Sequence, residues 1–330
     1  MAESGSTLLT LADIREAQER IRPFVHRTPV LTSGSLDRRV GAQLFFKCEN
    51  FQRVGAFKAR GAHNAVFALT ESEARRGVVT HSSGNHGAAV ALAARNRGIP
   101  AYVVMPATAA RVKQEAVARY GGRVTLCEPT LAARESTGRR IIDETGACFV
   151  HPYNDLRVIA GQGTSALELL EQVPDLDVIV CPVGGGGQLS GVAVAAKSLR
   201  PQLRIVGAEP AAADDARRSL AAGKLIAAGD PQTICDGLRS SLGDLSFALI
   251  RAWVDDIVTA SEDGIIDAMR LVWEILKIII EPSSAVPVAA LLERSLDVSG
   301  ARVGVILSGG NVDMDQLPWV RDALSACAAR

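Results

Sequence analysis

The sequence predicts an α/β protein made of two interleaved parallel-sheet domains. Short β-branched runs alternate with alanine-rich helical stretches, and glycine or proline stands at most of the joints between them. At 330 residues the chain is about twice as long as a typical domain, and no linker rich in Pro, Gly or Ser divides it. This alternation is typical of βαβ units, whose strands run parallel.

The clearest alternation lies in the middle of the chain. Strands are predicted at 77–83, 99–106, 123–129 and 147–152, and helices at 85–97, 110–121 and 131–145. We therefore expect residues 77–150 to form a small mobile α/β domain. It would be inserted into a large domain formed by residues 1–76 and 151–330, which the resemblance described below implies to be the cofactor-binding domain.

The flanking segments repeat the pattern on a larger scale. An amphipathic helix is predicted near the N-terminus, and strands are expected at 177–183, 204–210 and 303–310. Residues 261–280 read as one long helix that stops at Pro282, because proline cannot continue the hydrogen-bond ladder. The carboxyl ends of these strands are the expected location of ligands.

Charge and cysteine usage exclude several classes of protein. Lys and Arg number 36, as do Asp and Glu, so the net charge is zero and neither nucleic acid nor an acidic membrane is an expected partner. No secretory signal and no membrane-spanning run is recognisable. Six scattered cysteines without a CxxC pair favour reduced thiols and a cytoplasmic location.

A run of four glycines, Gly184 to Gly187, lies between a predicted strand and a helix. Backbone N–H groups at a helix N-terminus bind anions, so this loop is predicted to hold a phosphate. The G-x-G-x-x-G pattern of dinucleotide-binding proteins does not fit. Glu209 nevertheless ends the next strand, roughly where a ribose-binding acid would fall, so an NAD-dependent dehydrogenase is an alternative.

Three further loops carry polar groups suited to a site. Residues 82–87, SSGNHG, could bind a carboxylate, although for this loop taken alone a helix cap formed by Ser or Asn is the favoured interpretation. Lys58 stands at a predicted helix start, an unusual place for a structural cation, and a desolvated lysine can form a Schiff base. Ser308 follows the last strand and could be a turn residue or a partner for a ring nitrogen.

Together these loops resemble the fold-type II pyridoxal-phosphate (PLP) enzymes, specifically the serine/threonine dehydratase and serine racemase group. The resemblance rests on FFKCENFQRVGAFKARGA, THSSGNHG, HPYNDLRVIAGQGT, PVGGGGQLSG, GAEPAAADD and LSGGNVD, and extends from about residue 10 to 320. It implies that Lys58 carries the cofactor as a Schiff base and that Phe57 and Asn85 contact the ring. By the same resemblance, Gly184, Gly185, Gly186 and Gly187 would hold the phosphate and Ser308 would meet the pyridine nitrogen.

The resemblance also implies roles for the substrate and for a cation. Ser83 matches the acid/base of serine racemases, although a serine there is also a good helix cap. Glu209, the Ala213 carbonyl and Asp215 match a divalent-cation site, for which oxygen ligands suit Mg²⁺ or Ca²⁺, and an Asp-rich helix cap is the alternative. The resemblance places the substrate against Ser82, Ser83, Asn85, His86 and Arg134.

Some features favour a dicarboxylic substrate. Tyr153 replaces the Asn of mammalian-type serine racemases, and HPYND, EPSSAVP and GGNVDMDQLPW look more like 3-hydroxyaspartate dehydratases. Arg134 could bind the second carboxylate, although a solvated helix-surface arginine is the alternative.

The expected function is that of a homodimeric ammonia-lyase acting on a β-hydroxy amino acid: serine, threonine or 3-hydroxyaspartate. A serine racemase with side dehydratase activity is the alternative within the same group. A β-replacement synthase and a non-catalytic amino-acid sensor are further alternatives.

Overall fold

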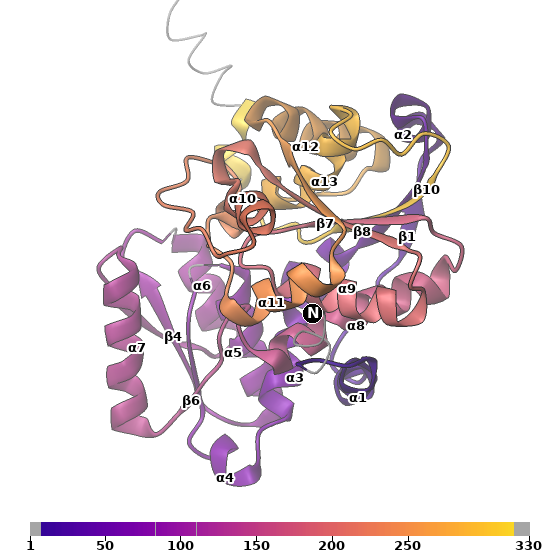
Figure 1. Ribbon diagram of the computed structural model, residues 1–330. Helices are drawn as coiled ribbons and strands as arrows, with labels where there is room; N and C mark the ends of the chain where they lie inside the picture. Colours follow the sequence, from indigo (N-terminus) through magenta and orange to yellow (C-terminus); the bar gives the residue numbers. More distant parts are fainter. Residues whose placement is uncertain (1–7, 83, 110, 320–330) are drawn as a thin grey trace, which may run out of the picture.

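The computed structural model describes residues 8–82, 84–109 and 111–319, and its elements fall into two α/β domains with parallel sheets (Figure 1). The larger sheet has six strands in the order β1-β2-β10-β7-β8-β9. Their bounds are β1 Val30–Thr32, β2 Gln43–Cys48, β7 Val178–Pro182, β8 Arg204–Pro210, β9 Asp256–Ala260 and β10 Arg302–Leu307. All neighbours pair in parallel except the edge strand β1, which is antiparallel to β2, so the predicted parallel-sheet architecture is confirmed with one antiparallel edge.

Buried helices cover both faces of the larger sheet. Strand β7 alternates its side chains, with Val180 facing a core that includes α12 and α13, and Ile179 facing a core that includes α8 and α9. Because both faces are buried, the strands are largely apolar, as expected for a parallel sheet, although β2 contains Lys47 and β8 contains Glu209. The helices of this domain are α1 Leu11–Ile21, α2 Gly34–Val40, α3 Lys58–Phe67, α4 Glu71–Ala74, α8 Leu156–Gln172, α9 Gly187–Leu199, α10 Asp215–Ala222, α11 Asp244–Trp253, α12 Glu262–Leu276 and α13 Pro282–Leu292.

The smaller sheet has four parallel strands in the order β5-β4-β3-β6. They are β3 Val78–His81, β4 Ala101–Pro106, β5 Arg123–Cys127 and β6 Cys148–Phe149, and the helices beside them are α5 Asn85–Arg97, α6 Arg111–Arg119 and α7 Leu131–Thr145. Helices α5 and α7 have the bounds that the sequence predicts. Short 3₁₀ turns lie elsewhere at η1 Glu49–Phe51, η2 Arg53–Gly55, η3 Ala211–Ala213, η4 Asp236–Leu238 and η5 Met314–Gln316.

The long helix predicted at 261–280 is wrong in its second half. Helix α12 ends at Leu276, Lys277 adopts a left-handed conformation with φ of 60°, and Pro282 begins α13 rather than ending α12. The indole nitrogen of Trp273 donates to the Ile280 carbonyl at 3.0 Å, which holds the chain as it turns between the two helices. Proline is well suited to a first helical turn, where its missing N–H has no partner to lose.

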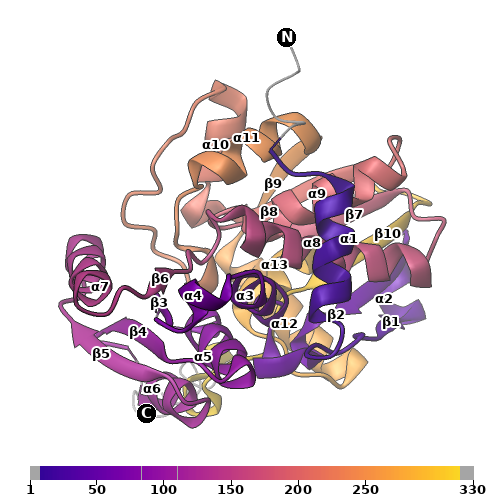
Figure 2. The same cartoon turned by 90° about the horizontal axis from the view of Figure 1, so that it is seen from below.

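Helix α3 lies between the two domains and packs against α5 on one side and α8 on the other (Figure 2). A buried ion network fixes it there: Arg60 donates to Glu49 and Glu168, and Lys47 donates to Glu168 at 2.7 Å. All four side chains are almost fully buried. The sequence analysis did not single out this network, which anchors the helix that begins with Lys58.

Candidate active site

Lys58 is the first residue of α3 and is held beside the end of β10. The Phe57 N–H donates to the Ser308 carbonyl at 3.0 Å, and Ala56 forms an isolated bridge with Gly309. The Lys58 Nζ donates to the Pro152 carbonyl at 2.7 Å. Burial lowers the pKa of Lys58 to about 8, against the opposing attraction of Glu281. A lysine with a depressed pKa supplies a neutral, nucleophilic amine near neutral pH.

The turn before Lys58 contains backbone strain that the sequence analysis missed. Val54 has φ of 56°, a left-handed conformation that is costly for a β-branched residue. The Asn311 amide donates to the Val54 carbonyl at 2.7 Å and thereby holds this conformation. Gly55 also has a positive φ, and a Cβ there would lie 2.7 Å from the Asn311 Oδ1. The GGN sequence after β10 therefore supports the turn that presents Lys58.

The four glycines occupy the loop between β7 and α9, at the carboxyl edge of the larger sheet. Gly186 has φ of 87° and forms the N-cap of α9, so backbone N–H groups are available at a helix N-terminus. The ring of Tyr153 rests directly on this loop, and a Cβ at Gly185 would lie 2.3 Å from its Cγ. The loop can therefore approach its neighbours only because it has no side chains.

One cavity of about 390 Å³ brings the predicted residues together. It lies where the carboxyl ends of strands from both sheets meet. Its lining includes Phe57, Lys58, Ser82, Asn85, His86, Arg134, Gly184, Gly185, Gly186, Gly187 and Ser308. Ser83 lies outside the described residues.

Among the described residues of the loop 82–87, no side-chain cap of α5 is found. Gly84 is the N-cap of α5 and offers no side chain, while the Ser82 hydroxyl accepts from the Gly84 N–H at 3.2 Å. His86 is buried beside Lys58, and this burial lowers the pKa of its imidazole well below the ordinary value. Its Nε2 lies 3.3 Å from the Val150 carbonyl, and its buried Nδ1 has no hydrogen-bond partner. Ser82 and His86 therefore offer polar atoms close to Lys58.

Asn85 is oriented by two residues that the sequence analysis did not assign. Its amide donates to the Glu281 carboxylate at 3.0 Å and 3.1 Å, and its carbonyl oxygen accepts from Asn311 at 2.9 Å. Burial and the nearby Asp236 carboxylate raise the pKa of Glu281 to about 7. The only sequence signal for Glu281 is an acid immediately before a proline at a predicted helix boundary.

Arg134 lines the cavity from the first turn of α7. Its Nε donates to the Thr130 carbonyl at 3.4 Å, and no carboxylate within the described residues forms an ion pair with it. Its guanidinium is thus a cation available to an anionic ligand.

The proposed cation ligands lie outside this cavity, at the end of β8. Glu209 accepts the backbone N–H groups of Arg217 at 2.7 Å and Ala216 at 3.2 Å. Burial raises the pKa of Glu209 to about 8 and that of Asp215 to about 6, and the two carboxylates repel each other. The Asp215 Oδ2 is buried without a hydrogen-bond partner. Within the described residues no cluster of three or more His, Cys, Asp or Glu side chains could hold a metal, so a carbonyl oxygen such as that of Ala213 would have to contribute.

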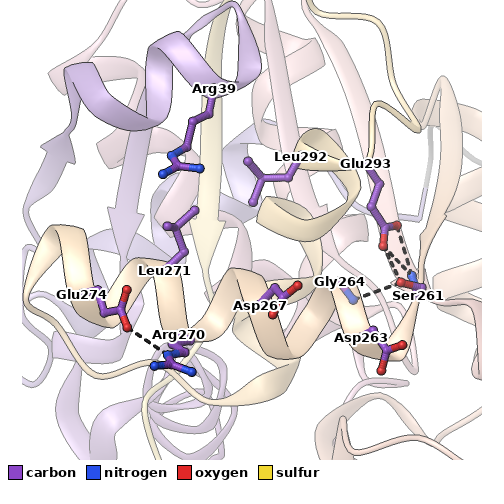
Figure 3. Close-up of a pocket in the computed structure, with 10 residues that line it drawn as sticks. All are labelled: Arg39, Ser261, Asp263, Gly264, Asp267, Arg270, Leu271, Glu274, Leu292 and Glu293. Carbon is purple, nitrogen blue, oxygen red and sulfur yellow. Dashed lines mark hydrogen bonds and ion pairs between the residues drawn. The ribbon is translucent and has the colours of Figure 1, made fainter. Parts of the chain in front are cut away.

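A second hollow, of about 700 Å³, lies along α12 and away from these loops. Figure 3 shows that its side chains are mostly charged, and some already contact one another, such as Arg270 with Glu274 and Ser261 with Glu293. None of the predicted site residues lines it. The cavity that contains Lys58 is therefore the candidate active site.

The model of the family described as "Pyridoxal-phosphate dependent enzyme" matches residues 21–309. The chain belongs to this family. Membership argues against the nicotinamide dehydrogenase, and it agrees with a lysine and a glycine loop that line one cavity.

Three proteins of known name are similar to this chain over most of its length. The β-hydroxyaspartate dehydratase of Paracoccus denitrificans (strain Pd 1222) is 54% identical over 94% of this chain and 98% of its own. A serine racemase of Oryza sativa subsp. indica is 52% identical over 96% of this chain and 95% of its own. The structure of maize serine racemase matches with a TM-score of 0.92 and 48% identity, covering 98% of this chain and all of that one. The resemblance inferred from the sequence is thereby confirmed.

Proposed function

We propose that the protein is a PLP-dependent ammonia-lyase that removes water and ammonia from a β-hydroxy amino acid to give a keto acid. The observation that carries the proposal is that Lys58 and the glycine loop line the same cavity of about 390 Å³, in which the Lys58 amine donates to the Pro152 carbonyl. The β-hydroxyaspartate dehydratase among the relatives supports it. When bound, the cofactor supplies an electron sink for the Cα carbanion.

The residues of the cavity fit this cofactor. The Lys58 amine would hold its aldehyde carbon, and the N–H groups of Gly184 to Gly187 would hold its phosphate. Phe57 would contact the ring, Asn85 the ring hydroxyl, and the nearly buried Ser308 the pyridine nitrogen. A serine hydroxyl does not protonate that nitrogen as a carboxylic acid would, which favours fast elimination over a long-lived carbanion.

Each polar group then has a task toward the substrate. Once the substrate amine has displaced it, the free Lys58 amine, which has a depressed pKa, would remove the proton at Cα. Ser82, Ser83, Asn85 and His86 would grip the α-carboxylate and hold the Cα–H bond perpendicular to the ring. Arg134, a cavity cation without an ion-pair partner in the described residues, would bind a second carboxylate. A dicarboxylate such as 3-hydroxyaspartate is therefore the preferred substrate.

Serine racemisation is the second candidate. The serine racemases of rice and maize favour it, and so does Ser83 at the position of the racemase acid/base. A second acid/base on the face opposite Lys58 would return a proton to Cα, whereas elimination needs only one face. Comparing Ser83→Ala with the parent for elimination from L- and D-serine separates the two.

We further propose a divalent cation, Mg²⁺ or Ca²⁺, at Glu209, Asp215 and the Ala213 carbonyl. Two buried carboxylates, one with an unpartnered oxygen, fit a hard cation. The cation would neutralise carboxylates that burial otherwise penalises.

The remaining proposals concern organisation. Residues 77–150 would move as a small domain over a large domain of residues 1–76 and 151–330 and exclude water during the reaction. Exposed Phe51, Ile279 and Met314 supply apolar surface for a homodimer. Five cysteines in the described residues are free thiols, which supports a cytoplasmic location. No helix in the described residues is long and apolar enough to cross a membrane.

The test is ammonia release by the PLP-loaded protein from serine, threonine and the 3-hydroxyaspartate stereoisomers, with Lys58→Ala alongside. We expect activity and a visible absorption band in the parent and neither in the variant. A parent that binds PLP but yields no ammonia, or a fully active Lys58→Ala, would refute the proposal.

A further inference from the structure

One ion pair joins the two domains at the mouth of the active-site cavity. Lys113, on α6, contacts the Asp236 carboxylate, on η4, and both residues line the cavity. Their side chains retain 32% and 45% of their exposure. The pair is therefore accessible to water and can break and reform without burying an unpaired charge.

The Asp236 side of this contact rests on a fixed support. The next residue, Gly237, donates its N–H to the Ser283 hydroxyl at 3.2 Å, which ties η4 to the first turn of α13. Leu238 packs on the glycine loop so closely that a Cβ at Gly184 would lie 2.9 Å from its Cα. Asp236 is thus held in place by the neighbouring residues Gly237 and Leu238, the second of which packs against the glycine loop.

The other ion pair between the domains lies elsewhere. Among the described residues, only Arg97 with Glu71 and Lys113 with Asp236 join residues 77–150 to the rest of the chain. Arg97 also donates to the carbonyls of Val66 and Leu69, close to where the chain enters the small domain. That pair therefore belongs to the connection between the domains, and the Lys113 pair to the cavity mouth.

We propose that Lys113 and Asp236 are positioning residues that hold the small domain closed over bound substrate. This inference rests on the proposed function in one respect: closure of the small domain would retain the substrate of that reaction. A contact that forms only in the closed state raises the population of that state. The apparent affinity for substrate rises with the population of the closed state. Because the pair is partly exposed, its effect is modest and sensitive to salt.

The experiment uses the PLP-loaded enzyme with Lys113→Met, Asp236→Asn and the exchanged pair Lys113→Asp/Asp236→Lys. Arg111→Gln is the matched control, because Arg111 lies on the same helix and pairs with Glu115 at an exposed site. We expect each single variant to raise KM for ammonia release by about two- to fivefold with a smaller change in kcat. About 0.5 M NaCl should largely remove the difference from the parent. The exchanged pair should recover part of the loss, and Arg111→Gln should match the parent.

Amide hydrogen exchange in α6 gives a readout that needs no turnover. Exchange should be faster in both single variants than in the parent and Arg111→Gln, and slower again in the exchanged pair. If amide exchange in α6 is unchanged in both single variants, the positioning role is refuted, whatever reaction the enzyme catalyses. A loss confined to Lys113→Met, with Asp236→Asn unaffected, also refutes it and assigns Lys113 to direct substrate binding. If exchange changes as expected but no ammonia is released, the positioning role stands and the proposed function fails.

Discussion

Gly185→Ala tests the most restrictive contact of the glycine loop. The added Cβ would lie 2.3 Å from Cγ and Cδ1 of the Tyr153 ring, far inside normal van der Waals contact. The ring cannot simply withdraw, because the backbone of Tyr153 already rests on Gly187 and the ring packs edge-on against His151 with centroids 4.7 Å apart. Overpacking of this kind costs about 1–3 kcal/mol. If the loop deforms to relieve it, affinity for PLP falls by about 5- to 150-fold.

The assay is equilibrium titration of the cofactor-free protein with PLP, followed by visible absorbance. Truncating the obstructing ring should relieve the clash. The double variant Gly185→Ala/Tyr153→Ala should therefore bind PLP more tightly than expected from adding the losses of PLP affinity in the two single variants. Gly138→Ala, in α7, is the control, since a Cβ there meets nothing within 4 Å. Parent-like PLP affinity in Gly185→Ala, with Tyr153 intact, would refute the steric argument.

Three further predictions concern stability and the cation. Arg60→Met leaves Glu49 buried without its cation, while Glu168 keeps only Lys47, and it should lower the free energy of unfolding by about 3–5 kcal/mol in urea titrations. A loss below about 1 kcal/mol would contradict the network's role. Burial lowers the pKa of His63 to about 4, so between about pH 6.5 and 4 the unfolded chain binds more protons and stability falls on acidification. His63→Gln should lose less stability than the parent between about pH 7 and 5, and equal losses would exclude His63 as a source. Millimolar Mg²⁺ or Ca²⁺ should raise the melting temperature of the parent, and EDTA should reverse the rise. The Asp215→Asn variant should show no rise. A full rise in melting temperature in that variant would place the cation elsewhere.

Much of the candidate site could be predicted from the sequence because local chemistry specifies it. A glycine run after an apolar strand exposes backbone N–H groups whatever the neighbours, and a lysine at a helix start is out of place for any purely local reason. Helices α5 and α7 were also predictable to the residue, because each is followed by a glycine C-cap, Gly98 or Gly146, which is a local signal.

Contacts between distant segments were not predictable. Glu281, Asn311 and Val54 acquire their roles only because the end of β10, the start of α13 and the turn before α3 meet around Lys58 and Asn85. The break after Leu276 was missed for a different reason: the apolar pattern of 261–280 is helical throughout, and a side-chain contact only seven residues long, from Trp273 to Ile280, stabilises the turn instead.

The sequence by itself determined the alternation of strands and helices, and it singled out the glycine loop and Lys58 as candidates for phosphate binding and reactivity, since each follows from a pattern within one stretch of chain. Only the tertiary structure decided the depressed pKa of Lys58, the orientation of Asn85 and the pairing of Lys113 with Asp236. Burial and electrostatic interaction depend on which segments come together in space, and separation along the chain does not specify that.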